Sequence, residues 1–275
     1  MRYYVFTDIH GMGKQFDHIV TYMESQGEDY QCFYLGDACD RGPDGFEIMN
    51  KLLDNPKIVY LKGNHEDMFV KACRAFYDMA AEEGYTPYEY AKAHSFSIIN
   101  VPYDSDIGLC MHNGGIPTLD AWLQHGCPKD FVRQIKKLPL KAQVTIEDEK
   151  GNPIRTFDMC HAGCIEAEWE TDNEEAMLWD RTHFSATWDP ADNIPHVLIH
   201  GHTPTIYLSR YAYDAEYSEC QECMPINYSN STKIDLDTGA FFSGRAWLMD
   251  LTTLECFAFG PEGKEEEEYE GTCCC

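Results

Sequence analysis

The sequence predicts a mixed α/β fold, and three observations carry that prediction. Short apolar runs typical of strands occur early in the chain, at residues 3–6, 32–35 and 58–61. Each run precedes a segment whose apolar residues recur with helical spacing, such as Phe16, Ile19, Val20 and Met23. Later apolar runs pair as hairpins, which adds antiparallel strands to a parallel set.

The helices of the first half follow from this spacing and from the residues that stop them. One helix is expected over 16–23 with its end near Gly27, and a second over 46–53 ends before Pro56. A third begins at His65 and runs through Phe76. The polar, tyrosine-rich segment 82–106 is interpreted as a helical insertion or as a cap over the site, and two further helices are expected near 122 and 131–135.

The second half contains the predicted hairpins and a second insertion. Residues 144–146 and 154–159 alternate around a polar turn at 149–153, and 196–200 form a buried strand. Segment 207–232, rich in Tyr, Ser and Asn, is an insertion, after which 233–240 and a hairpin over 247–259 resume strand patterns. We therefore expect one domain over 1–260, with an acidic, disordered tail over 261–275 that ends in cysteines.

Charge and composition exclude several classes of function. With 47 acidic and 21 basic residues, a formal charge of -26 repels nucleic acid and favours, if anything, basic protein substrates. No apolar run reaches the roughly 20 residues of a membrane span, and the N-terminus lacks a signal-peptide layout. A cytoplasmic protein is expected, and the sequence leaves its oligomeric state open.

The thirteen cysteines are odd in number and show no spacing of a disulfide framework, so most are expected to be reduced and buried. Cys39 and Cys160 adjoin candidate ligands and are interpreted as small residues in tight turns. Cys220 and Cys223 form a lone CxxC, and half of a zinc site completed by the terminal cysteines is the less favoured reading.

Polar clusters follow the first three strand-like runs. They are Thr7-Asp8-Ile9-His10-Gly11, Gly36 to Gly42 with the sequence GDACDRG, and Gly63-Asn64-His65-Glu66. Any one of them alone reads as a solvated loop. Three parallel strands present their carboxyl ends at one sheet edge, so together the clusters predict a metal site with Asp37 as the first candidate ligand.

Five motifs in order carry a resemblance to a known family. The three clusters are followed by His161-Ala162-Gly163 and Gly201-His202-Thr203-Pro204. The series resembles the phosphoprotein phosphatases, a family of binuclear metallophosphoesterases, and within it the branch of lambda-type protein phosphatases and symmetrical diadenosine tetraphosphate hydrolases. The resemblance implies a four-layer α/β/β/α sandwich, with two mixed sheets flanked by helices. Thr7 departs from the usual glycine but removes no ligand.

The resemblance also implies the site residues. It places Asp8 and His10 on one divalent cation and Asn64, His161 and His202 on a second, with Asp37 as the bridge. Manganese is expected, with iron or zinc as alternatives, because the ligands mix oxygen and imidazole. Arg41, Arg181 and Asn64 are assigned to bind the phosphate as hydrogen-bond donors. His65 is assigned as the general acid, and Asp40 as the carboxylate that fixes the tautomer of His65.

Two histidine assignments compete. His112, in the context His-Asn-Gly-Gly, is similar to the ligand context of eukaryotic members, whereas His161 is similar to the bacterial context and is preferred. His200 lies two residues before His202 and is expected to be a packed strand histidine.

The expected activity is a metal-dependent phosphatase in which a metal-bridging hydroxide attacks phosphate monoesters directly. Phosphoserine and phosphothreonine in proteins are the leading substrates, with phosphorylated small molecules as the other possibility. An alternative is a hydrolase of phosphoanhydrides, as in diadenosine tetraphosphate or an RNA cap. A non-catalytic metal-bound scaffold is the weakest reading, because His65, Asp40, Arg41 and Arg181 are all present.

Overall fold

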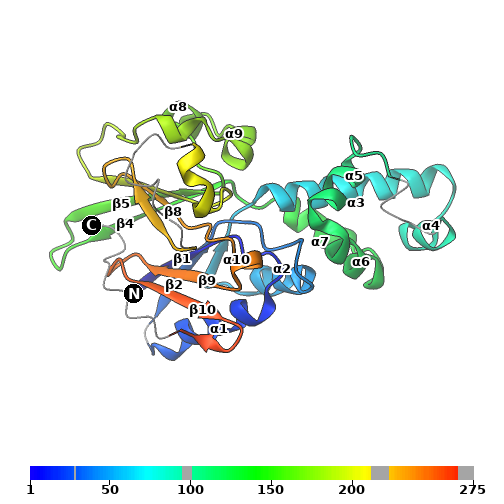
Figure 1. Ribbon diagram of the computed structural model, residues 1–275, viewed down its shortest axis with the longest axis horizontal. Helices are drawn as coiled ribbons and strands as arrows, with labels where there is room; N and C mark the ends of the chain where they lie inside the picture. The colour runs from blue at the N-terminus through cyan, green and yellow to red at the C-terminus, as the bar shows by residue number, and fades with distance from the viewer. Residues whose placement is uncertain (28, 95–100, 212–222, 266–275) are drawn as a thin grey trace.

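Two mixed β-sheets packed face to face form the centre of the molecule (Figure 1). The computed structural model describes residues 1–27, 29–94, 101–211 and 223–265. In the first sheet the strands run β11-β10-β9-β1-β2-β3, and in the second β4-β5-β6-β8-β7. The strands are β1 Arg2–Phe6, β2 Tyr30–Tyr34, β3 Ile58–Tyr60, β4 Lys141–Glu147, β5 Pro153–Cys160, β6 His196–His200, β7 Ile226–Tyr228, β8 Lys233–Asp235, β9 Ala246–Asp250, β10 Cys256–Gly260 and β11 Gly263–Lys264.

Apolar side chains from both sheets fill the space between them. Val5 and Phe33 from the first sheet belong to the same buried cluster as Phe157, Val197 and Ile199 from the second. The opposite face of the first sheet packs on α1 Gly13–Ser25 and α2 Gly45–Asp54, and that of the second on α8 Glu166–Glu170 and α9 Glu174–Trp179. The expected four-layer sandwich of mixed sheets is thereby confirmed.

The predicted parallel and antiparallel pairings both occur. β1, β2 and β3 are parallel neighbours, while β4 pairs with β5 and β9 with β10 as antiparallel hairpins. The second sheet is not purely antiparallel, however, because β5, β6 and β8 run parallel. The carboxyl ends of β5 and β6 therefore deliver their loops to one edge, as those of β1 to β3 do.

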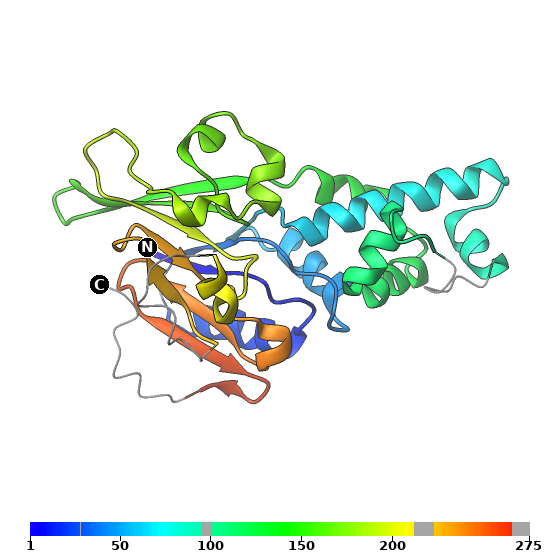
Figure 2. The same cartoon turned by 45° about the horizontal axis from the view of Figure 1, so that its top comes forward.

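A helical arm extends from the sandwich in both views (Figures 1 and 2). It consists of α3 Asn64–Glu82, α4 Pro87–Ala93, α5 Asp106–Cys110, the π-helical turn η2 Met111–Gly115, α6 Ile116–Gln124 and α7 Lys129–Lys136. Its core is aromatic, with Trp122 in contact with Phe69 and Phe76. Of the two expectations for segment 82–106, a helical insertion or a cap over the site, α4 fits the insertion, because it packs on α3 and α6 at the far end of α3.

The remaining elements surround the sheet edge or close the chain. They are the short helices η3 Thr182–Ser185, η4 Thr205–Arg210 and α10 Ala240–Ser243. β7, within the expected insertion 207–232, pairs with β8, and β11 extends the first sheet to Lys264, past the predicted domain end at 260. Cys220 and the cysteine-rich terminus lie outside the described residues. Within the described ranges, no helix is both long and apolar enough to span a membrane.

Candidate metal centre

The loops at the carboxyl edge of the sheets adopt an unusual backbone conformation. Asp8, His10, Asp37 and His202 all have positive φ, at 50°, 42°, 60° and 68°. Non-glycine residues rarely occupy this region, and such strain persists where surrounding structure fixes it, commonly at functional sites. This backbone conformation turns the four side chains, which follow the ends of their strands, toward a common centre.

Two glycines allow these loops to approach one another. A Cβ added at Gly201 would lie 2.0 Å from a carboxylate oxygen of Asp8, and one at Gly63 would lie 2.2 Å from Asp37. Both positions are therefore occupied by the residue without a side chain. The glycines of the third and fifth motifs permit close packing of the loops rather than merely marking turns.

Asp37 lies between two groups of candidate ligands. Its Oδ2 is 3.6 Å from His10 Nε2 and 3.8 Å from His65 Nε2, while its Oδ1 is 3.4 Å from His161 Nε2. The ligand atoms of His10, Asp37 and His65 lie within 4.8 Å of one another, as do those of Asp37, His161 and His202. One carboxylate thus belongs to both groups, which is the arrangement of a binuclear site.

The other expected ligands join these groups. Asp8 Oδ1 lies 4.0 Å from His10 Nε2. Asn64 Oδ1 lies 2.8 Å from His161 Nε2 and 3.0 Å from His202 Nδ1. The structure therefore brings together every residue expected to hold a cation.

The hydrogen bonds of the imidazoles suit cation binding. His10 Nδ1 bonds the carbonyl of Cys39 at 2.9 Å, and His161 Nδ1 bonds that of Leu35 at 3.0 Å. These bonds assign the proton to Nδ1 and leave a lone pair on Nε2. Toward the centre, His161 then presents an unprotonated nitrogen to the oxygens of Asn64 and Asp37, and converging lone pairs of this kind fit a cation.

The electrostatics of the buried groups agree with this fit. Burial lowers the pKa of His10, His161 and His202, so the rings are held in the neutral form that binds metals. Burial, with Asp237 and Asp37 nearby, raises the pKa of Asp8 well above its usual value. Burial also opposes ionisation of Asp37, but the surrounding histidines outweigh it and lower its pKa.

His65 forms a histidine–carboxylate pair beside the centre. Its Nδ1 lies 2.7 Å from Asp40 Oδ2, and its Nε2 lies 3.3 Å from Arg41 Nη2. Burial lowers the pKa of His65, but Asp37 and Asp40 raise it by more, so the net shift is upward. A raised pKa and an Nε2 that faces the ligand groups rather than a hydrogen-bonded carboxylate suit a general acid near neutral pH.

Arg41 and Arg181 lie on either side of the ligands. The backbone N–H of Arg41 donates to the carbonyl of Gly114 in η2, so the helical arm holds this loop. Arg181 Nε donates to Thr203 Oγ1 at 3.0 Å, next to His202. Both guanidinium groups are partly exposed, as expected for groups that receive an anion from solvent.

Glu66 belongs to the site but received no role from the sequence, and the same holds for Asp237, whose charge acts on Asp8. Glu66 is fully buried and accepts the backbone N–H groups of Asp37, Ala38 and Gly63 as well as the Tyr60 hydroxyl, all at 2.8 Å. It therefore fixes the loop that carries Asp37. Burial and the charge of Asp37 raise its pKa to about 7. The position of Glu66 in the third motif was the one sequence feature that pointed to a role. Its hydrogen bonds to the Asp37 loop join distant segments and cannot be read from the sequence.

The competing histidines lie elsewhere. His112 is on η2, exposed, with its ring 4.8 Å from that of Tyr103, and it joins neither ligand group of the described residues. His200 is buried with Nε2 2.6 Å from the Tyr228 hydroxyl, as a packed strand histidine would be. The geometry favours His161 over His112 as the ligand.

Fold and site together define the class of this protein, a metallophosphoesterase. An α/β/β/α sandwich carries two ligand groups that share a carboxylate, with guanidinium groups beside them. Residues 1–236 match the sequence model of the calcineurin-like phosphoesterases. The chain belongs to the calcineurin-like phosphoesterase family.

Individual relatives are more distant. Over 133 residues, 43% of this chain and 27% of the relative, it is 30% identical to the Caenorhabditis elegans "Putative serine/threonine-protein phosphatase C27B7.6". The chain thus matches about a quarter of the length of that relative. A solved structure titled "Crystal structure of a putative diadenosine tetraphosphatase" is 17% identical with a TM-score of 0.50, covering 94% of this chain and 92% of that chain. This similarity supports the fold.

A metallophosphoesterase from Sphaerobacter thermophilus is 12% identical, with a TM-score of 0.48, and covers 99% of this chain and 90% of that chain.

Proposed function

We propose that this chain is a phosphatase that hydrolyses phosphate monoesters, with phosphoserine and phosphothreonine in proteins as its substrates. The observation that carries the proposal is Asp37, shared by two ligand groups and flanked by His65 and Arg41. A shared carboxylate suits in-line displacement at phosphorus, and the adjacent acid and guanidinium suit an anionic ester with a poor leaving group.

The ligands of the two cations would be Asp8, His10, Asp37, Asn64, His161 and His202. When bound, such cations lower the pKa of water toward neutrality and neutralise charge on the phosphate. Manganese fits the mixed oxygen and imidazole ligands, with iron or zinc as alternatives. Glu66 and the Nδ1 bonds of His10 and His161 hold the ligands in place without contacting substrate.

The remaining residues act on the substrate itself. Arg41 and Arg181 bind the non-reacting phosphate oxygens, and Asn64 can add a neutral donor. His65 donates a proton from Nε2 to the departing alkoxide, while Asp40 fixes its tautomer from the other side of the ring. All of these groups lie within or beside the two ligand groups.

The buried thiols support a proposal for the cell compartment. The buried cysteines of the described residues, including the neighbours Cys160 and Cys164, are free thiols. Free thiols are usual in a reducing compartment, and we place the protein in the cytoplasm.

A substrate panel coupled to metal analysis tests the proposal. Chelator-stripped protein is expected to be inactive toward p-nitrophenyl phosphate and a phosphothreonine peptide, and two equivalents of manganese should restore both. Turnover of diadenosine tetraphosphate should be lower, because a formal charge of -26 opposes a polyanion. Faster cleavage of the dinucleotide would overturn the choice of substrate, and full metal binding without turnover of any ester would indicate a scaffold.

A further inference from the structure

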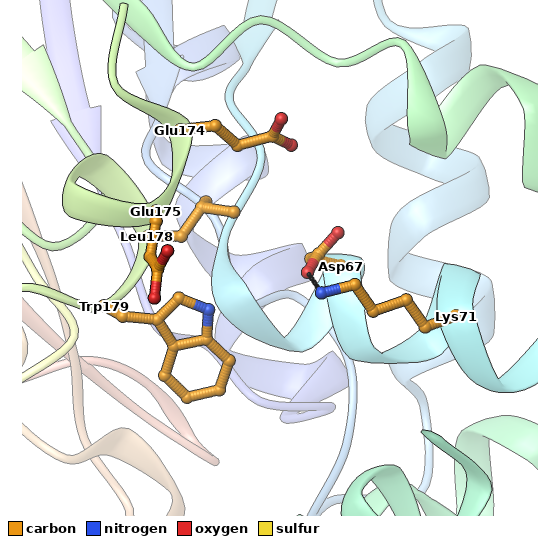
Figure 3. A pocket seen from close by; sticks show the side chains of 6 residues that line it. All are labelled: Asp67, Lys71, Glu174, Glu175, Leu178 and Trp179. Carbon is orange, nitrogen blue, oxygen red and sulfur yellow. Dashed lines mark ion pairs between the residues drawn. The ribbon is translucent and has the colours of Figure 1, made fainter. Parts of the chain in front are cut away.

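A cavity of about 390 Å³ opens between α3 and α9 (Figure 3). Its walls come from Asp67 and Lys71 on α3 and from the α9 residues Glu174, Glu175, Leu178 and Trp179. In Figure 3 the indole of Trp179 faces the Asp67–Lys71 pair across the opening. One wall of the cavity thus combines an indole with two carboxylates, and the other carries an Asp–Lys pair.

This cavity adjoins the candidate metal centre. The indole centroid of Trp179 lies 6.0 Å from the imidazole centroid of His202. On the opposite wall, Asp67 follows Asn64 by three residues, which places both on one face of α3. A substrate whose phosphate lies at the ligands would therefore extend across Trp179 into the cavity.

Two of the three carboxylates that line the cavity form ion pairs with lysines, and the third does not form one within the described residues. Asp67 Oδ2 pairs with Lys71 Nζ at 2.8 Å, and Glu174 Oε1 with Lys62 Nζ at 2.9 Å. Glu175 has no ion-pair partner among the described residues. The cavity therefore combines one uncompensated carboxylate with an indole face. These two groups together suit a cationic side chain, which a carboxylate attracts and an aromatic face binds through its quadrupole.

We infer that this cavity binds a lysine or arginine side chain of the substrate polypeptide, two or three residues from the phosphorylated residue. The inference rests on the proposed function and names its substrate class more closely. An extended peptide rises by about 3.3 Å per residue, so two residues cover the step from His202 to Trp179. A nucleotide polyphosphate would place negative charge against Glu175, which opposes binding.

Kinetics on matched phosphothreonine peptides test this inference. The peptides carry lysine, alanine or glutamate at the second or third position on either side of the phosphothreonine, and p-nitrophenyl phosphate serves as a substrate too small to reach the cavity. For the native protein, kcat/KM should be roughly five- to thirtyfold higher for the best lysine peptide than for its alanine counterpart.

Variants of Glu175 identify the cavity as the source of the preference. Glu175→Gln should remove most of the lysine preference, and Glu175→Lys should reverse it in favour of glutamate. Neither should change turnover of p-nitrophenyl phosphate or of the alanine peptide. The matched control is Glu170→Gln, which removes the same charge from an exposed position on α8 outside the cavity lining, and it should keep the preference.

The outcomes separate the two proposals. Equal turnover of the lysine and alanine peptides, or an equal loss on all peptides in Glu175→Gln, would overturn the cavity assignment while p-nitrophenyl phosphate is still hydrolysed. Absence of turnover on every ester, with metals bound, would instead overturn the proposed function.

Discussion

Two histidine–carboxylate pairs lie at opposite ends of the strands. They differ in whether one ring nitrogen of the histidine has no hydrogen-bonded carboxylate. His65, at the carboxyl edge, bonds Asp40 through Nδ1 at 2.7 Å. His196, at the start of β6, bonds Asp158 through Nδ1 at 2.6 Å and Asp192 through Nε2 at 2.8 Å. In both cases burial lowers the pKa and the carboxylates more than offset it.

The comparison shows that a histidine with a carboxylate partner is not by itself a catalytic pair. His196 uses both ring nitrogens on carboxylates, so no nitrogen remains for a substrate. His65 keeps Nε2 directed toward Asp37 and Arg41. The His196 pair is therefore suited to stability, and the His65 pair to proton transfer.

The largest effect is expected where the shared carboxylate is changed. Asp37→Asn should lose both cations and reduce turnover of p-nitrophenyl phosphate by at least about a thousandfold, because metal ions contribute several kcal/mol to catalysis. Metal content per chain and kcat are the two measurements. Normal turnover with full metal content would refute the site assignment.

His65→Asn should lower kcat on a phosphoserine peptide by about 10²- to 10⁴-fold, the usual contribution of a general acid. The loss should be smaller on p-nitrophenyl phosphate, whose leaving group needs little protonation, and metal content should stay unchanged. Asp40→Asn should show the same substrate pattern to a lesser degree. Equal losses on both substrates together with loss of metal would make His65 a ligand instead of an acid.

His196→Gln should leave kcat within about twofold and cost about 1–3 kcal/mol of unfolding free energy, because buried Asp158 loses a charged partner. Urea unfolding at constant metal concentration measures the cost. A large loss of activity at unchanged stability would remove the distinction between the two pairs.

The loss of unfolding free energy in His196→Gln should depend on pH with a definite sign. The pKa of His196 in the folded protein is raised, so its pairing stabilises fully below the unfolded value of about 6.5. This stabilisation is lost as pH rises through the folded pKa. The difference in unfolding free energy between the native protein and His196→Gln should therefore be largest near pH 6 and shrink above it. Urea unfolding curves across this pH range measure that difference.

The smallest effect is expected at the exposed end of this pair. Asp192→Asn should cost less unfolding free energy than His196→Gln, since the Asp192 side chain is half exposed and water can replace the lost contact. Urea unfolding of Asp192→Asn and His196→Gln under one set of conditions compares the two losses of unfolding free energy directly. A cost equal to that of His196→Gln would mean that Asp192, not Asp158, is the main partner.

Much of the fold could be predicted from local patterns. Helical spacing identified α1 and α2, and turn residues located the hairpin of β4 and β5. Apolar runs that end in Asp, His and Asn identified the strands that carry Asp8, Asp37 and Asn64. Such features depend on neighbours a few residues away, so the sequence contains them directly.

Contacts between distant segments could not be predicted in this way. The sequence left His112 and His161 as competing ligands, and only sheet order places His161 3.4 Å from Asp37. The bonds of Glu66 to the Asp37 loop and the cavity between α3 and α9 likewise join segments far apart in the chain. The sequence alone determined the ligand types and their strand ends, whereas the tertiary structure decided which of them meet, because long-range packing sets those distances.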